Sequence, residues 1–320
     1  MQITKFVLAA TLVLVTTLAR AAGMKAIEVP ADSGGPALRA FVWSPCATPA
    51  ADVRIGPYML PGVRNCPIAG DKLPLIVISH GHGGSHLGHH DTAETLADAG
   101  FIAVALDHPG DTHSDMSRAG DISVFVERPT DIKRLIDFML TSSPDSAKID
   151  PERIGFFGFS RGGYTGLVVA GANPDFPNSH VPCPDPHAPI CAEIQRSDIP
   201  GPLAHDSRVK AVVIADPLSF FPTADSLKDV KAPIQLWGSE RGGDGVLPES
   251  VAALARDLPV KPDFHVVPNA AHFAFLTPCP PELTVSAPGI CADAPGFDRI
   301  AFHKEFNAAV LAFFHKHLVE

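Results

Sequence analysis

Short apolar runs alternate with helical patterns along most of this 320-residue sequence, and this alternation restricts the possible folds more than any other feature. The runs are rich in β-branched and aromatic residues and end in turn residues, at 73–81, 101–110, 153–163, 209–217, 233–239 and 263–269. Helical patterns lie between or after them, at 91–100, 128–141, 161–172, 248–258 and 302–318. Strands that are apolar on both faces and separated by helices predict an α/β protein with a mostly parallel central sheet flanked by helices.

Two proline-rich segments interrupt the alternation, at 173–207 and 277–297. Their proline content argues against regular elements, and long irregular segments of a compact domain usually serve as lids or tails. Each contains a pair of cysteines, which favours an ordered loop over a tail. We therefore expect a single domain over residues 22–320, with both segments as lid-like loops near the active site.

The first 21 residues have the order of a secretory signal peptide. Lys5 precedes an apolar run over 6–18, and Ala-Arg-Ala follows at 19–21. The run is short for a membrane-spanning helix, and small residues suited to cleavage come directly after it. We expect cleavage after Ala21, export to the periplasm or secretion, and no integral membrane segment in the mature chain.

All six cysteines lie beyond the expected cleavage site. An even number of cysteines in an exported protein indicates disulfides. Because each cysteine has a near neighbour in a loop-like segment, we predict the pairs Cys46 with Cys66, Cys183 with Cys191, and Cys279 with Cys291. None of them has C-x-x-C spacing, so zinc or redox chemistry is not indicated.

The net charge is −10, and the lysines and arginines form no run. Proteins that bind nucleic acid or anionic membranes usually carry a basic patch. We expect neither partner here, and the sequence leaves the oligomeric state open.

The pentapeptide GFSRG at 158–162 matches the pattern G-x-S-x-G. It stands between an apolar strand pattern and a helical pattern, where a nucleophile elbow places its serine. The flanking glycines remove side chains that would clash in such a tight turn. We predict that Ser160 is a nucleophile, and a serine hydroxyl needs a neighbouring base to activate it.

The base and the acid should follow this serine in the chain. His272, in NAAHFAFL, lies after the last predicted strand and is the expected base. Asp244, in SERGGDGVLP, and Asp216, in VVIADPLSFFP, both fit the order for the acid, with Glu240 a weaker third. We prefer Asp244, because DGVLP is typical of the acid turn that follows the next-to-last strand, and Asp216 stays as the alternative.

Ester hydrolysis also needs donors for the developing oxyanion. One is the backbone amide of Arg161, directly after the nucleophile. The other should come from HGHGG at 80–84, after an earlier strand, where the amide of His82 is the expected donor.

Five histidines crowd into SHGHGGSHLGHHD at 79–91, which suggests a competing hypothesis of a metal-binding protein built on the His80–His90 cluster. The stretch lacks an H-x-H-x-D-H arrangement, and no second cluster of ligands follows. We therefore expect no metal and no other cofactor.

With these residues in place, the chain resembles α/β-hydrolases of the dienelactone-hydrolase-like group, which includes proteins similar to platelet-activating-factor acetylhydrolase. The resemblance covers residues 73–317 and rests on VISHGHGGS, ALDHPGDT, ERPTDIKRLIDFML, GFSRGGYTGLVVAGA and NAAHFAFLTPCPP. It implies the α/β-hydrolase fold and the same nucleophile, base and oxyanion donors. In the acetylhydrolase branch the acid ends the earlier strand, as Asp216 would. Phe159 and Arg161 depart from the residues that often flank the elbow serine, which bears on substrate preference.

These features together predict a serine hydrolase that cleaves carboxylic esters through an acyl-enzyme, with a small-molecule or lipid ester as its substrate. The alternative is a lipase or phospholipase-type acyl hydrolase, similar to platelet-activating-factor acetylhydrolase.

Overall fold

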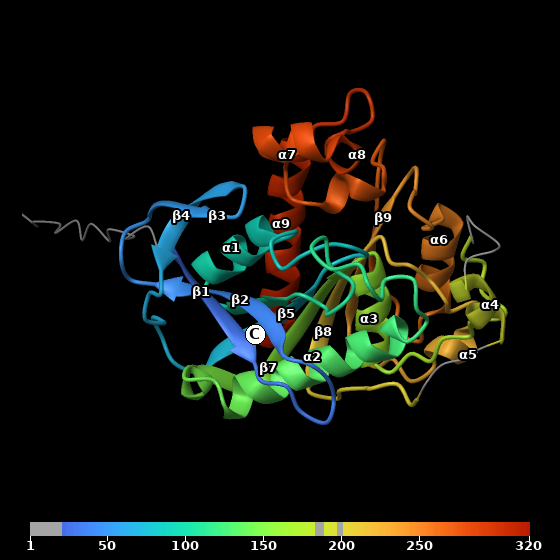
Figure 1. Ribbon diagram of the computed structural model, residues 1–320, viewed down its shortest axis with the longest axis horizontal. Coiled ribbons are helices and arrows are strands. Elements are labelled where there is room, and N and C mark those ends of the chain that lie inside the picture. Colours follow the sequence, from blue (N-terminus) through green and yellow to red (C-terminus); the bar gives the residue numbers. More distant parts are fainter. Residues whose placement is uncertain (1–20, 183–188, 197–200) are drawn as a thin grey trace, which may run out of the picture.

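The computed structural model describes residues 21–182, 189–196 and 201–320, which form one ten-stranded sheet with helices on both faces (Figure 1). The strand order is β10-β9-β8-β7-β5-β6-β2-β1-β4-β3. The parallel part consists of β5 (Leu73–Ser79), β6 (Ile102–Leu106), β7 (Ile149–Phe159), β8 (Val209–Ala215), β9 (Ile234–Ser239) and β10 (Asp263–Val267). Each predicted apolar run forms one of these strands, and the predicted α/β class is confirmed.

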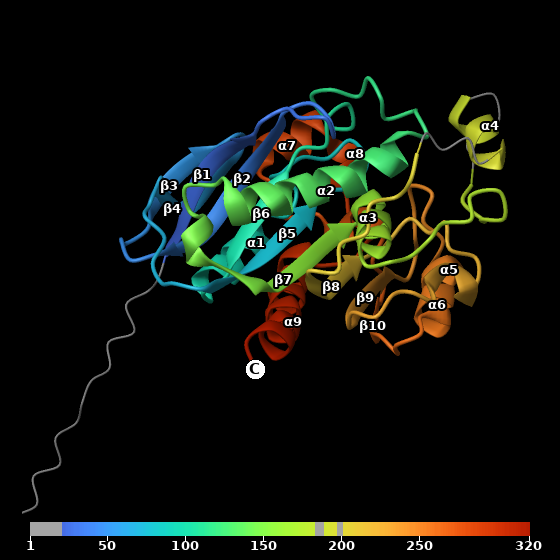
Figure 2. The same cartoon turned by 90° about the horizontal axis from the view of Figure 1, so that it is seen from below.

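Four N-terminal strands extend this sheet and were not predicted. They are β1 (Ala21–Val29), β2 (Leu38–Cys46), β3 (Ala51–Ile55) and β4 (Tyr58–Arg64). β2 joins them to the parallel part by pairing antiparallel to β6. Figures 1 and 2 both show these strands at one end of the molecule and α4, α5 and α6 at the other.

The two faces of the sheet bury separate hydrophobic cores, because successive residues of a strand point in opposite directions. In β5, Leu75 and Val77 join the core under α2, α3 and α6, whereas Ile76 and Ile78 join the core under α1 and α9. The helices run over α1 (His90–Asp98), α2 (Val124–Thr141), α3 (Arg161–Val169), α6 (Pro248–Asp257) and α9 (Arg299–Leu318). Both cores contribute strand residues buried below 3% exposure, which explains why these runs are apolar throughout.

Helix α2 begins four residues before the predicted start and contains Pro129. Proline has no amide hydrogen, so the carbonyl of Phe125 has no helical donor. The hydroxyl of Tyr164, from α3, donates to that carbonyl at 3.2 Å. A tertiary contact therefore replaces the missing helical bond, which the local sequence could not reveal.

The proline-rich segments contain short helices, which corrects the expectation of irregular structure. These are α4 (Pro189–Arg196) in the first segment, and α7 (Pro281–Ser286) and α8 (Pro288–Cys291) in the second. Each begins at a proline, because the first helical position needs no amide donor and proline presets its backbone angle. A short helix α5 (Ala224–Leu227) follows β8.

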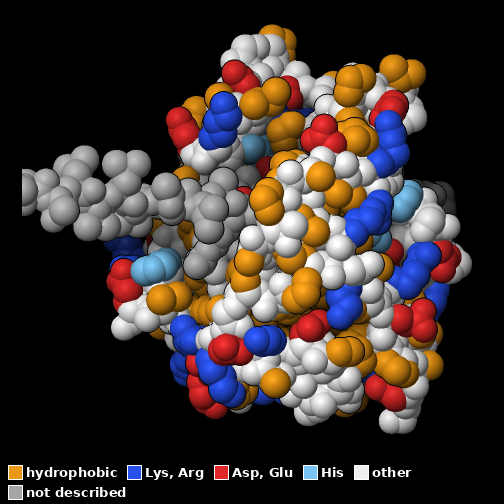
Figure 3. All heavy atoms as spheres, turned by 90° about the vertical axis from the view of Figure 1, so that its left-hand side faces the viewer, with side chains coloured by type: hydrophobic (Ala, Val, Ile, Leu, Met, Phe, Trp, Pro, Cys, Tyr) orange, Lys and Arg blue, Asp and Glu red, His pale blue; other side chains and the backbone are white. Residues whose placement is uncertain are grey.

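Disulfides join Cys46 to Cys66 and Cys279 to Cys291, as predicted. The third predicted pair involves Cys183, which lies outside the described residues. So does nearly all of the expected signal peptide, over 1–20. Within the described ranges, no helix combines the length and the apolar character needed to cross a bilayer. On the face that carries β3 and β4, acidic and basic side chains are interspersed (Figure 3).

Candidate active site

Ser160 lies between β7 and α3 in a strained turn, with φ +55° and ψ −117°. A side chain at Gly158 would place its Cβ 2.2 Å from the carbonyl oxygen of Gly162. A side chain at Gly162 would place its Cβ 2.1 Å from the carbonyl oxygen of Ser79. Neither position can accept a Cβ, so the structure requires both glycines of the G-x-S-x-G pattern and gives the turn a nucleophile-elbow geometry.

His272 begins the 3-10 turn His272–Phe275 that follows β10, and its side chain reaches Ser160. Its Nε2 lies 3.0 Å from the hydroxyl oxygen of Ser160. The backbone amide of His272 donates to the carbonyl of Gly242 at 3.0 Å, and the Phe159 ring stacks on the imidazole at 4.6 Å between centroids. The two residues predicted as nucleophile and base are therefore brought together.

The carboxylate beside His272 belongs to Asp216, which corrects the preference for Asp244. Oδ2 of Asp216 lies 2.7 Å from Nδ1 of the imidazole. Asp216 directly follows β8, is fully buried, and also accepts hydrogen bonds from the amide and the hydroxyl of Ser239, both at 2.8 Å. Ser239 ends β9, so two neighbouring strand ends fix this carboxylate.

Among the described residues, Asp244 makes no hydrogen bond or ion pair with His272, whose Nδ1 is taken by Asp216. It is exposed, at the tip of a turn in which Gly243 and Val246 exchange backbone hydrogen bonds. Burial lowers the pKa of His82, and the charge of Asp244 opposes that shift. The Asp244 carboxylate therefore lies near enough to His82 for its charge to act on that imidazole.

The loop His80–Gly84, which we call the oxyanion loop, follows β5 and approaches Ser160 closely. A Cβ at Gly81 would lie 3.2 Å from the Cβ of Ser160 and 3.0 Å from the Phe159 ring. Within the described ranges, no group accepts a hydrogen bond from the amide of His82 or that of Arg161. Both amides are thus unengaged beside the nucleophile.

Four of the five crowded histidines have separate partners. His80 donates from Nδ1 to the carbonyl of Gly81, His86 lies 2.9 Å from Asp107, and His90 lies between Glu94 and Thr277. His89 packs against two phenylalanine rings. In the part of the chain that the structure describes, no three His, Cys, Asp or Glu side chains are grouped as metal ligands.

Sequence reasoning missed a buried pair of a histidine and a carboxylate behind the turn that carries His272. His303 Nδ1 lies 2.6 Å from Oδ2 of Asp91, and its Nε2 lies 2.9 Å from the carbonyl oxygen of Ala274. These two contacts hold the His303 ring between the Asp91 carboxylate and the turn that carries His272. Burial would raise the pKa of Asp91, but the bond from His303 lowers it well below its usual range. The pair ties α1 and α9 to the turn that carries His272.

A cavity of about 920 Å³ lies between α1, α7, α9 and the β3–β4 hairpin, and His303 and Asp91 line it. Its lining does not include Ser160 or His272, whose exposed fractions are 4% and 1%. This cavity is therefore separate from the Ser160 hydroxyl.

Comparisons with known proteins found hydrolases that match parts of this chain. Residues 70–183 match a family model described as serine aminopeptidase, S33. A segment of 107 residues is 31% identical to a protein of Bradyrhizobium sp named "Probable 2-oxo-3-(5-oxofuran-2-ylidene)propanoate lactonase". A segment of 122 residues is 29% identical to a protein of Nocardia uniformis subsp. tsuyamanensis named "Putative esterase NocK". These segments cover 32% and 37% of this chain, and they span 43% and 35% of those relatives, less than half of each.

Solved structures match over nearly the whole chain. A ferulic acid esterase from Streptomyces cinnamoneus has a TM-score of 0.65 at 22% identity, over 96% of this chain and 92% of that one. A dienelactone hydrolase from Anabaena variabilis has a TM-score of 0.51 at 17% identity, over 93% and 99%. The sheet topology and the likeness to these two structures show that the chain has the α/β-hydrolase fold.

Proposed function

We propose that this chain is a serine hydrolase that cleaves carboxylic esters through an acyl-enzyme, with Ser160 as nucleophile, His272 as base and Asp216 as acid. The observation that carries the proposal is the line of two short contacts from the Ser160 hydroxyl through the imidazole to the buried carboxylate, 3.0 and 2.7 Å long. Such a line at a nucleophile elbow is the arrangement that acyl transfer needs.

The contacts of Asp216 set the proton positions. Its Oδ1 accepts from the amide of Ser239, and its Oδ2 accepts from the Ser239 hydroxyl. A carboxylate held by these donors favours a proton on Nδ1 of His272. The lone pair of Nε2 then faces the Ser160 hydroxyl and can take its proton as the oxygen attacks the substrate carbonyl.

The remaining steps follow from the same groups. The amides of His82 and Arg161 would donate to the oxyanion that forms when the Ser160 oxygen bonds to the carbonyl carbon. The protonated His272 would then give its proton to the departing alcohol, leaving an ester on Ser160. Water, deprotonated by His272, would attack this ester and release the carboxylic acid. The cycle uses no cofactor.

We propose a small ester as the substrate class. Ser160 and His272 are nearly buried, which favours a compact acyl group over a long lipid chain. The proteins that this chain resembles are named as esterases, a lactonase and a dienelactone hydrolase, all of which act on acyl–oxygen bonds. The lipase or phospholipase-type alternative predicts activity that rises with chain length and at lipid interfaces.

We also propose export to the periplasm or secretion, with cleavage after Ala21. The support is the signal-like order of the first 21 residues and the two described disulfides, a bond type rare in reducing compartments. Mass spectrometry of the protein recovered from the culture medium or periplasm should give a first residue of Ala22. Recovery of the uncleaved chain in the cytosol would contradict this proposal.

Hydrolysis of a p-nitrophenyl ester series tests the proposed activity. We expect turnover of the acetate and butyrate by the wild type and by Ser142→Ala, an exposed serine at the end of α2. Ser160→Ala should be inactive and should resist labelling by a fluorophosphonate. Full activity in Ser160→Ala would refute the proposal. Inhibition by a chelator would instead favour a metal-dependent mechanism.

A further inference from the structure

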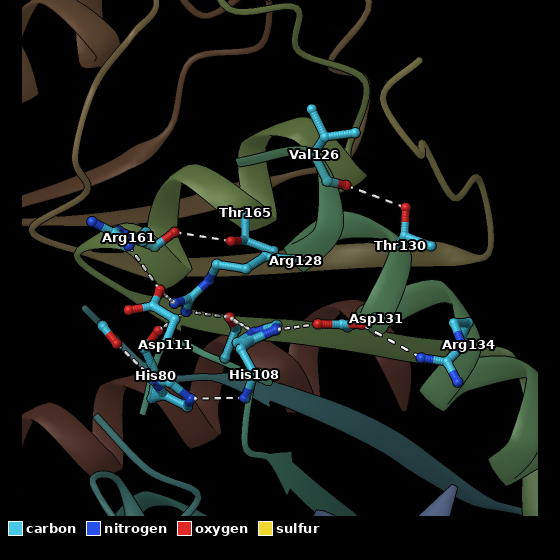
Figure 4. A network of polar contacts seen from close by, with 12 residues as sticks. His80, His108, Asp111, Val126, Arg128, Thr130, Asp131, Arg134, Arg161 and Thr165 are labelled. Atoms are coloured by element: carbon cyan, nitrogen blue, oxygen red, sulfur yellow. Dashed lines mark hydrogen bonds and ion pairs between the residues drawn. The ribbon is translucent and has the colours of Figure 1, made fainter. Parts of the chain in front are cut away.

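A buried cluster of Asp111, Arg128 and Arg161 lies beside the oxyanion loop (Figure 4). Oδ2 of Asp111 accepts from Nη1 of Arg128 at 2.5 Å and from Nη1 of Arg161 at 2.9 Å. Asp111 and Arg128 are fully buried, and the side chain of Arg161 is 9% exposed. One carboxylate thus bridges the β6–α2 connection, helix α2 and the first residue of helix α3.

The same cluster holds the oxyanion loop on both sides of His82. Arg128 donates from Nη2 to the carbonyl of His80. The amide of Gly83 donates to Oδ1 of Asp111 at 3.1 Å. The residues that flank His82 in the loop are therefore fixed by the two partners of one ion pair.

The second oxyanion amide is tied to the same carboxylate. Arg161 supplies that amide from its backbone, and its guanidinium reaches Asp111 and the carbonyl of Ala119, at 2.9 and 3.2 Å. The two amides come from separate loops, after β5 and after β7. Asp111 is the group on which the bonds from both loops converge.

The three charged side chains of the cluster, two arginines and one carboxylate, carry a net charge of +1. Burial would raise the pKa of Asp111, but Arg128 and Arg161 lower it, so the carboxyl is ionised. Burial lowers the pKa of Arg128 to about 10, which still leaves it charged at neutral pH. His80, which also contacts this region, stays neutral because burial lowers its pKa to about 4.

A buried ion cluster is a poor device for stability alone, since desolvation of the charges offsets much of their attraction. It does impose direction, because guanidinium groups donate in a fixed planar geometry. An oxyanion hole requires such direction, because its donors must already point to the place where the negative charge develops.

We propose that Asp111, Arg128 and Arg161 form a positioning cluster that sets the separation of the His82 and Arg161 amides and adds positive potential at the oxyanion. The inference rests on the proposed function. Arg161 is one of the two residues at which this elbow departs from the common pattern. The proposal gives its side chain a role that is separate from the role of its backbone amide.

The test compares Arg161→Met with Arg161→Lys, which keeps the charge, and with Asp111→Asn, which keeps an acceptor for Gly83. Arg299→Met is the matched control, because Arg299 is also nearly buried and also binds one carboxylate and one carbonyl, those of Asp293 and Ile290. Two quantities are measured for each variant: the kinetics with p-nitrophenyl acetate and the affinity for a boronic acid that bonds to Ser160. The concentration of active sites is determined by titrating a separate sample with a fluorophosphonate, so that misfolded molecules are not counted.

We expect Arg161→Met to lower kcat about 10- to 100-fold, below the loss on removal of a whole oxyanion donor, with KM changed less than about threefold. Boronate affinity should fall in parallel, Asp111→Asn should show the same pattern, and Arg161→Lys should recover most of the loss. Arg299→Met should lower the melting temperature but keep kcat.

Retention of kcat within about twofold in both Arg161→Met and Asp111→Asn would overturn the inference. So would an effect on KM alone, or a loss in Arg299→Met equal to that in Arg161→Met. If Arg161→Met does not fold, Arg161→Gln takes its place in the comparison. A wild type without turnover would overturn the proposed function as well, whereas an active wild type with an inactive Ser160→Ala leaves that function standing whatever the arginine variants do.

Discussion

Replacement of Asp216 by asparagine should abolish most of the proposed esterase activity while leaving the fold intact. Asn has the same shape, and its carbonyl can keep the acceptor role toward the amide of Ser239, which is 2.8 Å away. Its NH₂ group would then face Nδ1 of His272, where Oδ2 now lies at 2.7 Å. The imidazole would have to accept at Nδ1 and carry its proton on Nε2, so it could no longer take the proton of Ser160.

The expected size of this effect follows from the two roles that are lost. The wrong tautomer removes the general base, and the neutral amide no longer stabilises the imidazolium. In serine proteases the equivalent change lowers kcat about 10⁴-fold, which corresponds to about 5.5 kcal/mol of transition-state stabilisation. We expect a loss of this order for Asp216→Asn. Asp244→Asn should stay within about threefold of the wild type, because Asp244 is exposed and, among the described residues, makes no hydrogen bond or ion pair with His272.

The assay is kcat and KM for p-nitrophenyl acetate at pH 7 to 8, with the amount of folded protein measured by circular dichroism. A loss confined to kcat at unchanged melting temperature is the predicted result. If Asp244→Asn loses activity and Asp216→Asn keeps it, the assignment of the acid from this structure is wrong. If Asp216→Asn unfolds the protein, Asp216→Glu should retain the fold and partial activity, since it keeps the charge.

Three further predictions concern stability. Burial lowers the pKa of His80 to about 4 and that of His89 to about 3. As the pH falls below about 6.5, these two histidines therefore bind protons in the unfolded chain but not in the folded chain. Each histidine should lower the free energy of unfolding by about 1.4 kcal/mol per pH unit, down to about pH 4. His89→Leu should reduce that slope in urea unfolding at pH 5, 6 and 7, and an unchanged slope would contradict the reasoning. Replacing both cysteines of the Cys279–Cys291 bond by serine should cost about 3 kcal/mol, and a cost below about 1 kcal/mol would mean that the bond adds little order. Gly162→Ala should prevent folding, because its Cβ would meet the Ser79 carbonyl oxygen at 2.1 Å; Gly120→Ala, with nothing within 4 Å, is the control, and soluble, native-like Gly162→Ala would refute the steric argument.

The parallel part of the sheet could be predicted because its signal is local. Each buried strand needs a run of apolar residues, and each run in the sequence stands at a strand of the structure, as 153–163 does at β7. The strands β3, at one edge of the sheet, and β4 beside it give a weaker signal, because exposed and buried positions are mixed in both. In β4 the buried and exposed positions alternate over Tyr58–Arg64, a pattern too short to separate from a loop.

The short helices of the proline-rich segments were missed for a related reason. Proline disfavours the interior of a helix but suits its first position. Counting prolines over a segment therefore hides a helix such as α7, which begins at Pro281.

The amino-acid sequence by itself determined the elbow serine, the histidine after the last strand and the two local disulfides described, because each depends on residues close together in the chain. Only the tertiary structure decided which carboxylate meets His272. Asp216 and Asp244 follow neighbouring strands in the same chain order, and the choice depends on the path of a loop and on the bonds from Ser239 that hold Asp216 in place. The tertiary structure likewise separated the crowded histidines and brought Asp111, Arg128 and Arg161 together, since side chains 17 to 50 positions apart meet only when the sheet and its helices are assembled.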